Sequence, residues 1–251
     1  MYHSITFGDK NTWDDWRIVP SSRPVIAPPS VKTKTIDIPG SNGILDLSES
    51  LTGYPTYNNR EGSLEFIVMN DYKEWYQAYS DIMDYLHGQE MTAILEDDKE
   101  YYYKGRFSVN EWRSEADYSR ITIDYNVEPY KLLNRTSLED WKWDPFNFRT
   151  GVIFTPFKNM EVTTAHKYYK LDSRLMGQAP FCPTFTVTST DGKGVTVHFI
   201  NKRLGIDSTK VLPNGTTQVP EFIFYGNTMQ LYMYCSSETA TVSIDFRQGR
   251  L

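Results

Sequence analysis

The 251-residue sequence has few of the residues that build disulfide frameworks and metal sites. It contains two cysteines, Cys182 and Cys235, which are too few for a disulfide framework. Its four histidines form no HExxH or His-x-His motif, and the cysteines form no CxxC. Metal sites need clustered ligands at such spacings. We therefore expect no metal and no cofactor. Cys235 has the strand parity of Met229, Leu231 and Met233, so we expect it to be a buried, apolar residue.

The catalytic sequence motifs are also missing. There is no GxSxG elbow, no Walker loop and no GxGxxG after a predicted strand. The acidic run Glu96-Asp97-Asp98 could supply the two carboxylates, about 5 Å apart, of a retaining glycosidase. It stands next to Lys99 between two predicted strands, however, so we interpret it as a solvated turn. We expect no catalytic residues, and a glycan-cleaving enzyme is the weakest interpretation.

Long apolar segments are absent as well. No run of 18 apolar residues occurs, and the N-terminus has no apolar signal-peptide region. We therefore expect no transmembrane helix and no membrane partner. The low cysteine count fits synthesis in a reducing cytoplasm.

Charge divides the chain into two halves. Residues 1–130 hold 12 basic against 22 acidic residues, a net charge of −10, whereas residues 131–251 hold 14 against 10, a net charge of +4. This asymmetry favours two domains, 1–130 and 131–251. The acidic half argues against specific nucleic-acid binding, because phosphate contacts need Lys or Arg.

The hydrophobic pattern predicts an α+β N-terminal domain that is rich in strands and has one helix. The helix is expected over Asp71–Leu86, with Asp71 as its cap and Gly88 as its stop. Its apolar face has helical spacing: Trp75, Tyr79, Ile82 and Leu86. Strands are expected at residues 60–69, 91–95, 101–112 and 118–127, and a short hairpin at 35–47.

The C-terminal domain reads as strands and turns only. Residues 195–199, 229–235 and 241–246 alternate between apolar and polar side chains, and Asp191-Gly192 and Asn214-Gly215 are hairpin dipeptides. This pattern predicts an all-β sandwich of the jelly-roll type. Residues 131–180 have an irregular pattern, which suggests a linker followed by the first strands.

Prolines and tryptophans make the N-terminal segment unusual. Proline fixes φ and disfavours helix before it, so residues 11–62 should run extended with few ladder hydrogen bonds. A long extended arm with exposed tryptophans suits a chain that lays it across a neighbouring copy. The candidate interface residues are Trp13, Trp16, Arg23, Pro24, Pro28 and Pro29.

The same segment carries a family resemblance. Its motifs, in order, are Trp13-Asp14-Asp15-Trp16, Arg23-Pro24, Pro28-Pro29, Ile38-Pro39-Gly40-Ser41-Asn42-Gly43, Leu45-Asp46-Leu47 and Asn59-Arg60. Further motifs are Leu86-His87-Gly88, Tyr103-Lys104-Gly105-Arg106 and Glu128-Pro129-Tyr130. Together they resemble the distal tail protein (Dit) family of siphophages that infect Gram-positive hosts. The resemblance covers the first half of the chain well and the second half in general character.

The resemblance implies a structural protein of the virion tail tip. Members form a hexameric ring, single or double, that joins the tail tube protein to the tail-associated tip protein. The galectin-like C-terminal domain offers a docking platform for receptor-binding or other baseplate proteins. If DNA passes through such a ring, the acidic N-terminal half should line an electronegative bore that does not hold phosphate.

A different class of function also fits the aromatic residues. Trp141, Trp143, Tyr168 and Tyr169 could form a sugar-stacking platform, which would make the protein a carbohydrate-binding protein that contacts host cell-wall glycan. The same residues could instead pack the linker onto a sheet. The sequence leaves both alternatives open.

The change of charge and pattern near Pro129 generates a first prediction. Limited proteolysis of the native protein should cut between Glu128 and Thr136, because linkers between domains expose the backbone. Mass spectrometry of the fragments locates the cut. Cleavage elsewhere that leaves this stretch intact would refute the boundary.

Overall fold

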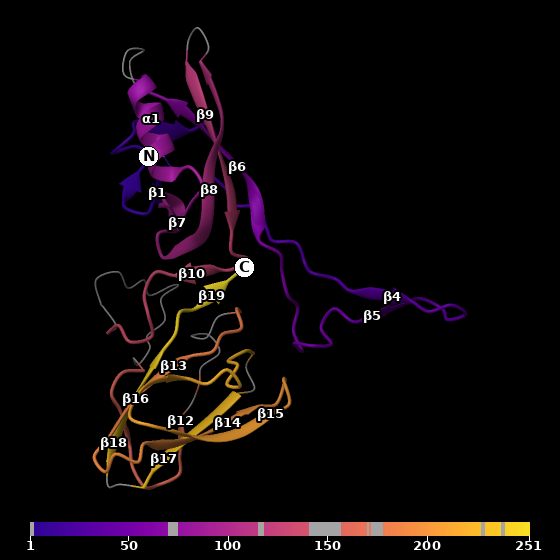
Figure 1. The fold of residues 1–251 in the computed structure, drawn as a ribbon, viewed down its shortest axis with the longest axis vertical. Coiled ribbons are helices and arrows are strands. Elements are labelled where there is room, and N and C mark those ends of the chain that lie inside the picture. Colours follow the sequence, from indigo (N-terminus) through magenta and orange to yellow (C-terminus); the bar gives the residue numbers. More distant parts are fainter. Residues whose placement is uncertain are drawn as a thin grey trace. The chain divides into compact units, whose positions relative to one another are not determined.

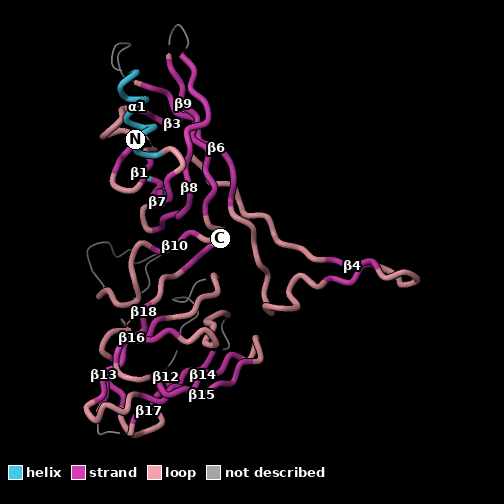
Figure 2. Tube along the Cα trace, viewed as in Figure 1, coloured by secondary structure: helices cyan, strands magenta, loops and turns pink. Residues whose placement is uncertain are grey.

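The computed structural model describes residues 3–69, 75–114, 118–140, 157–169, 171, 178–226, 229–236 and 239–251. The chain separates into two compact units, residues 1–134 with Leu251 and residues 135–250. Strands dominate both units, and the described ranges contain one α-helix, α1 (Figure 2). The predicted β-rich character of the chain is confirmed. No helix in these ranges has the length and hydropathy that a membrane span requires.

The N-terminal unit is built on one antiparallel sheet. Its strands lie in the order β2-β1-β7-β8-β9-β6-β3, and β10 pairs with β8. The strands are β1 (Ile5–Phe7), β2 (Lys10–Asn11), β3 (Ile18–Pro20), β6 (Arg60–Val68), β7 (Gln89–Leu95), β8 (Tyr101–Ser114), β9 (Ser119–Val127) and β10 (Lys131–Leu133). A separate two-stranded sheet pairs β4 (Thr35–Asp37) with β5 (Ile44–Asp46).

Strand alternation makes the core of this unit. In β9, Ile121, Ile123 and Tyr125 are buried, and the residues between them face the other side of the sheet. The helix α1 (Trp75–Leu86) adds Ile82 and Leu86 to the same apolar cluster. It ends at Leu86, and Gly88 follows with φ at +74°, the left-handed conformation that favours glycine just after a helix. The predicted cap, Asp71, lies outside the described residues.

Trp16 is buried in this core, so the expectation of an exposed tryptophan is wrong at this position. Only 6% of Trp16 is accessible. Its ring centroid lies 5.6 Å from that of Tyr85 on α1 and 6.3 Å from that of Phe7 on β1. The proline-rich composition did not reveal that the helix and β1 form a pocket for the indole.

The start of the predicted linker is ordered as a strand. Leu132 and Leu133 of β10 pair with Tyr102 and Tyr101 of β8, and the Asn134 amide donates to the Glu100 carbonyl at 2.7 Å. Residues 131–134 are therefore tied to the N-terminal unit. The predicted protease-sensitive stretch therefore includes a paired strand. Asn134 and Arg135, which follow β10, are exposed.

The C-terminal unit contains two four-stranded antiparallel sheets, ordered β11-β18-β13-β16 and β12-β17-β14-β15. The first sheet consists of β11 (Met160–Val162), β13 (Thr184–Ser189), β16 (Gly215–Gln218) and β18 (Ala240–Asp245). The second consists of β12 (Lys167–Tyr169), β14 (Val195–Asn201), β15 (Ile206–Leu212) and β17 (Met229–Cys235). A short β19 (Gly249–Arg250) follows. Figure 1 shows these strands in orange to yellow.

Both sheets bury one face in a single apolar cluster. Val187 and Val242 come from the first sheet, and Phe199 and Leu231 come from the second. Cys235 belongs to the same cluster and is buried, as predicted. The shared core accounts for the clean alternation in β14 and β17, because every second side chain faces the other sheet.

Burial of Trp16 generates a second prediction. Trp16→Ala should lower the free energy of unfolding of the N-terminal unit by about 3–5 kcal/mol, the cost of a cavity left by a large aromatic side chain. Chemical denaturation followed by circular dichroism measures it. The matched control is Trp13→Ala, which removes a half-buried indole and should cost about 1 kcal/mol. Equal losses in the two variants would contradict the assignment.

Candidate functional site

The most distinctive surface feature is an arm, defined here as residues 30–58. Figure 1 shows it projecting away from the sheet of the N-terminal unit, with β4 and β5 near its end. Hydrogen bonds join its two sides: Lys32 N donates to Thr56 O at 2.8 Å, and Asn58 N donates to Ser30 O at 2.9 Å. The arm is therefore an ordered hairpin.

The arm exposes apolar side chains on both of its faces. Leu51 is 99% accessible, and large apolar residues are exposed along the rest of the arm: Val31, Ile36, Ile38, Ile44 and Leu45. No arm residue belongs to either described core cluster. Exposed apolar patches mark interaction sites, and a two-stranded hairpin is marginally stable by itself. The arm therefore has the character of a segment that packs on another surface.

The root of the arm is held by buried polar groups. The Tyr125 hydroxyl accepts from the Ala27 amide at 2.9 Å, and Arg60 Nη1 donates to the Ala27 carbonyl at 3.2 Å. Arg60 Nε donates to the Pro129 carbonyl at 2.8 Å. Gly62 lies directly opposite Tyr125 in the ladder. A Cβ at Gly62 would sit 2.4 Å from the Tyr125 hydroxyl, so the bare glycine makes room for this clamp.

Arg60 is a buried cation. It is 4% accessible and, among the described residues, makes no ion pair with a carboxylate. Burial lowers the pKa of Arg60, but a guanidinium keeps its charge in proteins. The two carbonyls and the Tyr103 ring, whose centroid is 5.5 Å from the guanidinium carbon, stabilise it.

The predicted interface residues divide into two groups. Trp16 and Pro24 are buried within the N-terminal unit, so they are not available on its surface. Trp13 and Pro29 are half-buried, while Arg23 and Pro28 are exposed. Sequence reasoning missed the apolar arm residues, because a strand with apolar residues on both faces resembles a strand of a buried sheet. The nearby turn dipeptides, Pro39-Gly40 and Asn42-Gly43, were the available signal of a hairpin.

The acidic run Glu96–Asp98 forms a single 3₁₀ turn between β7 and β8, so it is the turn we predicted. Its carboxylates hold neighbouring segments. Asp97 contacts His3 Nδ1 at 2.9 Å and Arg23 Nε at 2.8 Å, and Asp98 pairs with Lys131. Glu96 accepts from the Ser4 amide at 3.0 Å. These contacts fasten the N-terminus, the approach to the arm and β10 to one turn.

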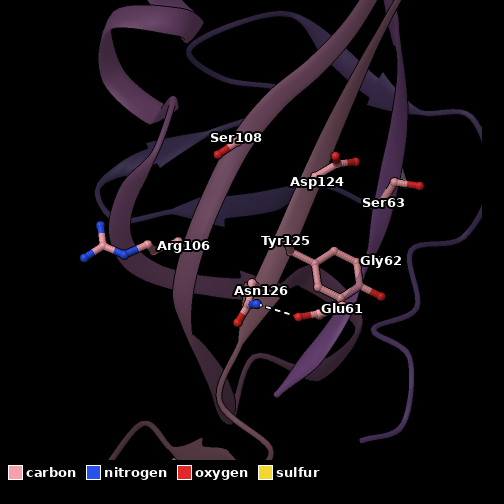
Figure 3. Close-up of a pocket in the computed structure, with 8 residues that line it drawn as sticks. All are labelled: Glu61, Gly62, Ser63, Arg106, Ser108, Asp124, Tyr125 and Asn126. Carbon is pink, nitrogen blue, oxygen red and sulfur yellow. Dashed lines mark hydrogen bonds between the residues drawn. The ribbon is translucent and has the colours of Figure 1, made fainter. Parts of the chain in front are cut away.

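An open hollow of about 470 Å³ lies on the sheet across β6, β9 and β8 (Figure 3). Polar side chains dominate its lining, among them Glu61, Ser108, Arg106 and Asp124. Glu61 accepts a hydrogen bond from Asn126 Nδ2 at 2.7 Å. No histidine or cysteine lines it, and the described residues hold no cluster of His, Cys, Asp and Glu suited to a metal. Register places Ser63 and Ser108 opposite Asp124, but among the described residues no hydrogen bond joins either serine to this carboxylate, as an activated nucleophile would require.

The structure describes two of the four residues predicted to form a sugar platform. Trp141 and Trp143 lie outside the described residues. Tyr168 and Tyr169 are neighbours in β12, so their side chains point to opposite faces of the sheet. Tyr169 packs against the core and donates its hydroxyl to the Glu161 carbonyl, whereas Tyr168 is exposed beside Tyr232.

Comparison with solved structures finds a match over nearly the whole chain. The chain has the fold of a protein from a phage adsorption apparatus. One matching structure is the Dit protein (gp 19.1) of SPP1, described as a paradigm of the hub adsorption apparatus in phages that infect Gram-positive bacteria. The match has a TM-score of 0.57 and 13% identity, and it covers 97% of this chain and 98% of that one. No family profile and no curated protein matches the sequence.

The contacts of Asp97 generate a third prediction. Hydrogen bonds from His3 and then from Arg23 lower the pKa of Asp97 below its ordinary value. A depressed carboxyl pKa stabilises the fold above the unfolded-state pKa of about 3.9, and this contribution is lost as pH falls through the lower folded-state value. Arg23→Ala should move the Asp97 pKa upward in a carboxyl-carbon NMR titration. Arg113→Ala, which breaks the Arg113–Glu111 pair instead, should leave it unchanged.

Proposed function

We propose that this protein is a structural component of a phage tail tip, a Dit-like hub protein whose copies close a hexameric ring. The arm is the observation that carries the proposal. It is ordered, apolar on both faces and held by a buried clamp at its root. The similarity of the whole fold to SPP1 Dit supports a hub component over other uses of such an arm.

In this proposal the arm makes an asymmetric contact between copies. The arm lies on one side of the N-terminal unit, so copies that receive each other's arms make a heterologous, head-to-tail interface. Such an interface closes into a ring when the rotation from one copy to the next is a whole fraction of 360°. Burying the exposed leucine, isoleucine and valine side chains supplies a driving force of about 25 cal/mol per Å² of apolar surface.

The two units take different roles in this proposal. The N-terminal unit, α+β in class, builds the ring and contacts the tail tube protein and the tail-associated tip protein. The C-terminal unit is a jelly-roll, galectin-like sandwich that docks receptor-binding or other baseplate proteins. The ring stands at the virion tail tip, in one or two layers.

The bore of the ring is electronegative in the same proposal. Residues 1–130 carry a net charge of −10 per chain, which repels phosphate and lets DNA pass without being held. The net positive charge of the C-terminal half stands outside the ring.

The ring generates the fourth prediction. Native mass spectrometry at micromolar concentration should show a hexamer or a double hexamer. The double variant Ile36→Asp/Ile44→Asp places charges on the exposed faces of β4 and β5, so it should shift the population to monomer without lowering thermal stability. Val211→Asp, at an equally exposed strand valine of the C-terminal unit, should leave the assembly intact. A wild-type protein that is only monomeric would refute the proposal.

A further inference from the structure

The second sheet of the C-terminal unit carries a row of rings on the face away from the core. Register places Tyr168 of β12 opposite Tyr232 of β17, and Tyr232 opposite His198 of β14. The ring centroids are 5.3 Å and 5.8 Å apart along this row. The inward neighbours in these strands fill the core, so this face is built from the alternate positions of the same strands.

A second layer of aromatic contact comes from outside the strands. His166, which is exposed and precedes β12, stacks on Tyr232 with centroids 5.2 Å apart and lies 4.8 Å from Tyr234. Tyr168 at the end of the row is 47% accessible. Five rings from three segments therefore gather on one side of the sheet. We name this set, with Asp207, the aromatic face: His166, Tyr168, His198, Asp207, Tyr232 and Tyr234.

Hydrogen-bonding groups border these rings. His198 Nε2 lies 2.7 Å from Asp207 Oδ1, and the Asp207 side chain is 71% accessible. Its second oxygen is an acceptor with two lone pairs, and the tyrosine hydroxyls both donate and accept. Strand parity places the polar residues Thr196, Thr209 and Gln230 on the same face.

Charge and composition narrow the class of ligand. Asp207 is the one formally charged residue at the described strand positions of this face, because Lys210 and Lys167 occupy the opposite parity. Without Lys or Arg there, the face does not suit a phosphate polymer. Few aliphatic side chains stand there, namely Ile200 and Val211, so it does not resemble an apolar peptide groove either.

Cross-strand aromatic pairs alone explain part of this arrangement, since they stabilise sheets. They do not explain an accessible carboxylate fixed by an imidazole beside the rings. Ring faces that take C–H groups, together with a few oriented polar groups that take hydroxyls, match the two surfaces of a pyranose. We propose that the aromatic face binds an uncharged polysaccharide, with the rings stacking on sugar C–H faces and Asp207 accepting from sugar hydroxyls. This site is independent of the ring proposed above.

The test uses the full-length protein in native gels cast with one polysaccharide each: dextran, β-galactan, soluble β-1,3-glucan or poly(glycerol phosphate). We expect retardation by at least one uncharged polymer and not by the phosphate polymer. Tyr168→Ala and Asp207→Ala should each weaken the dissociation constant about fivefold or more, the value of one stacking or hydrogen-bond contact. The matched control is Tyr76→Ala, at an exposed tyrosine of α1 in the other unit, which should bind like wild type.

Saturation-transfer NMR with the retarding polymer gives a second readout at low affinity. Transfer should reach sugar C–H protons and fall in Tyr168→Ala. The proposal is overturned if no uncharged polymer binds in either assay, if poly(glycerol phosphate) alone binds, or if Tyr168→Ala and Tyr76→Ala bind equally. A protein partner would be indicated instead if no sugar binds and if the wild-type protein captures a phage protein that Tyr168→Ala and Asp207→Ala do not capture. None of these outcomes depends on the oligomeric state, so they separate this site from the ring.

Discussion

The arm can stay extended only because the sheet holds its root. Arg60 and Tyr125 engage both backbone groups of Ala27, the last residue before Pro28-Pro29. The two prolines then fix φ where the chain leaves the sheet. Burying a guanidinium without a carboxylate partner costs free energy. Here the charge of Arg60 is stabilised by carbonyl acceptors and by the ring of Tyr103. The unfavourable burial is confined to Arg60. In return, the arm, which has no core of its own, leaves the sheet in a defined direction.

The same guanidinium reaches Pro129, the point where β9 has ended and β10 is about to begin. Tyr130 continues this contact, because its ring meets Tyr57 edge-to-face at 5.8 Å, and Tyr57 bridges to Val31 at the base of the arm. The approach to the arm is also fastened from the other side, where Asp97 holds Arg23. The root is therefore fixed by several separate elements of the N-terminal unit, so its direction does not depend on one weak surface ion pair.

Periodic patterns carried the sequence-based predictions that succeeded. Strong alternation identified β9, β14 and β17, and Gly88 marked the end of α1, because a buried face repeats its signal every second residue or every turn. The failures have a different cause. Trp16 was expected to be exposed, but it lies in a segment without a periodic pattern, and its pocket is completed by Tyr85, which is far away in sequence, together with Phe7. Residues 131–133 were too few to show alternation, although they complete a ladder with β8.

The candidate surfaces were harder to predict than the core because they break the pattern that reveals strands. In the arm, Ile36 and its partner Leu45 lie on one face, whereas Ile44, opposite Asp37, lies on the other face. Neither face therefore has the polar pattern of a solvent-exposed side. In the C-terminal unit, Tyr168 and Tyr169 looked like one pair, yet the pleat of β12 sends them to different surroundings. Rings from β14 and β17 join Tyr168 only through the register. A sequence shows that aromatic residues are numerous, and strand pairing decides which of them meet on a face that a ligand can reach.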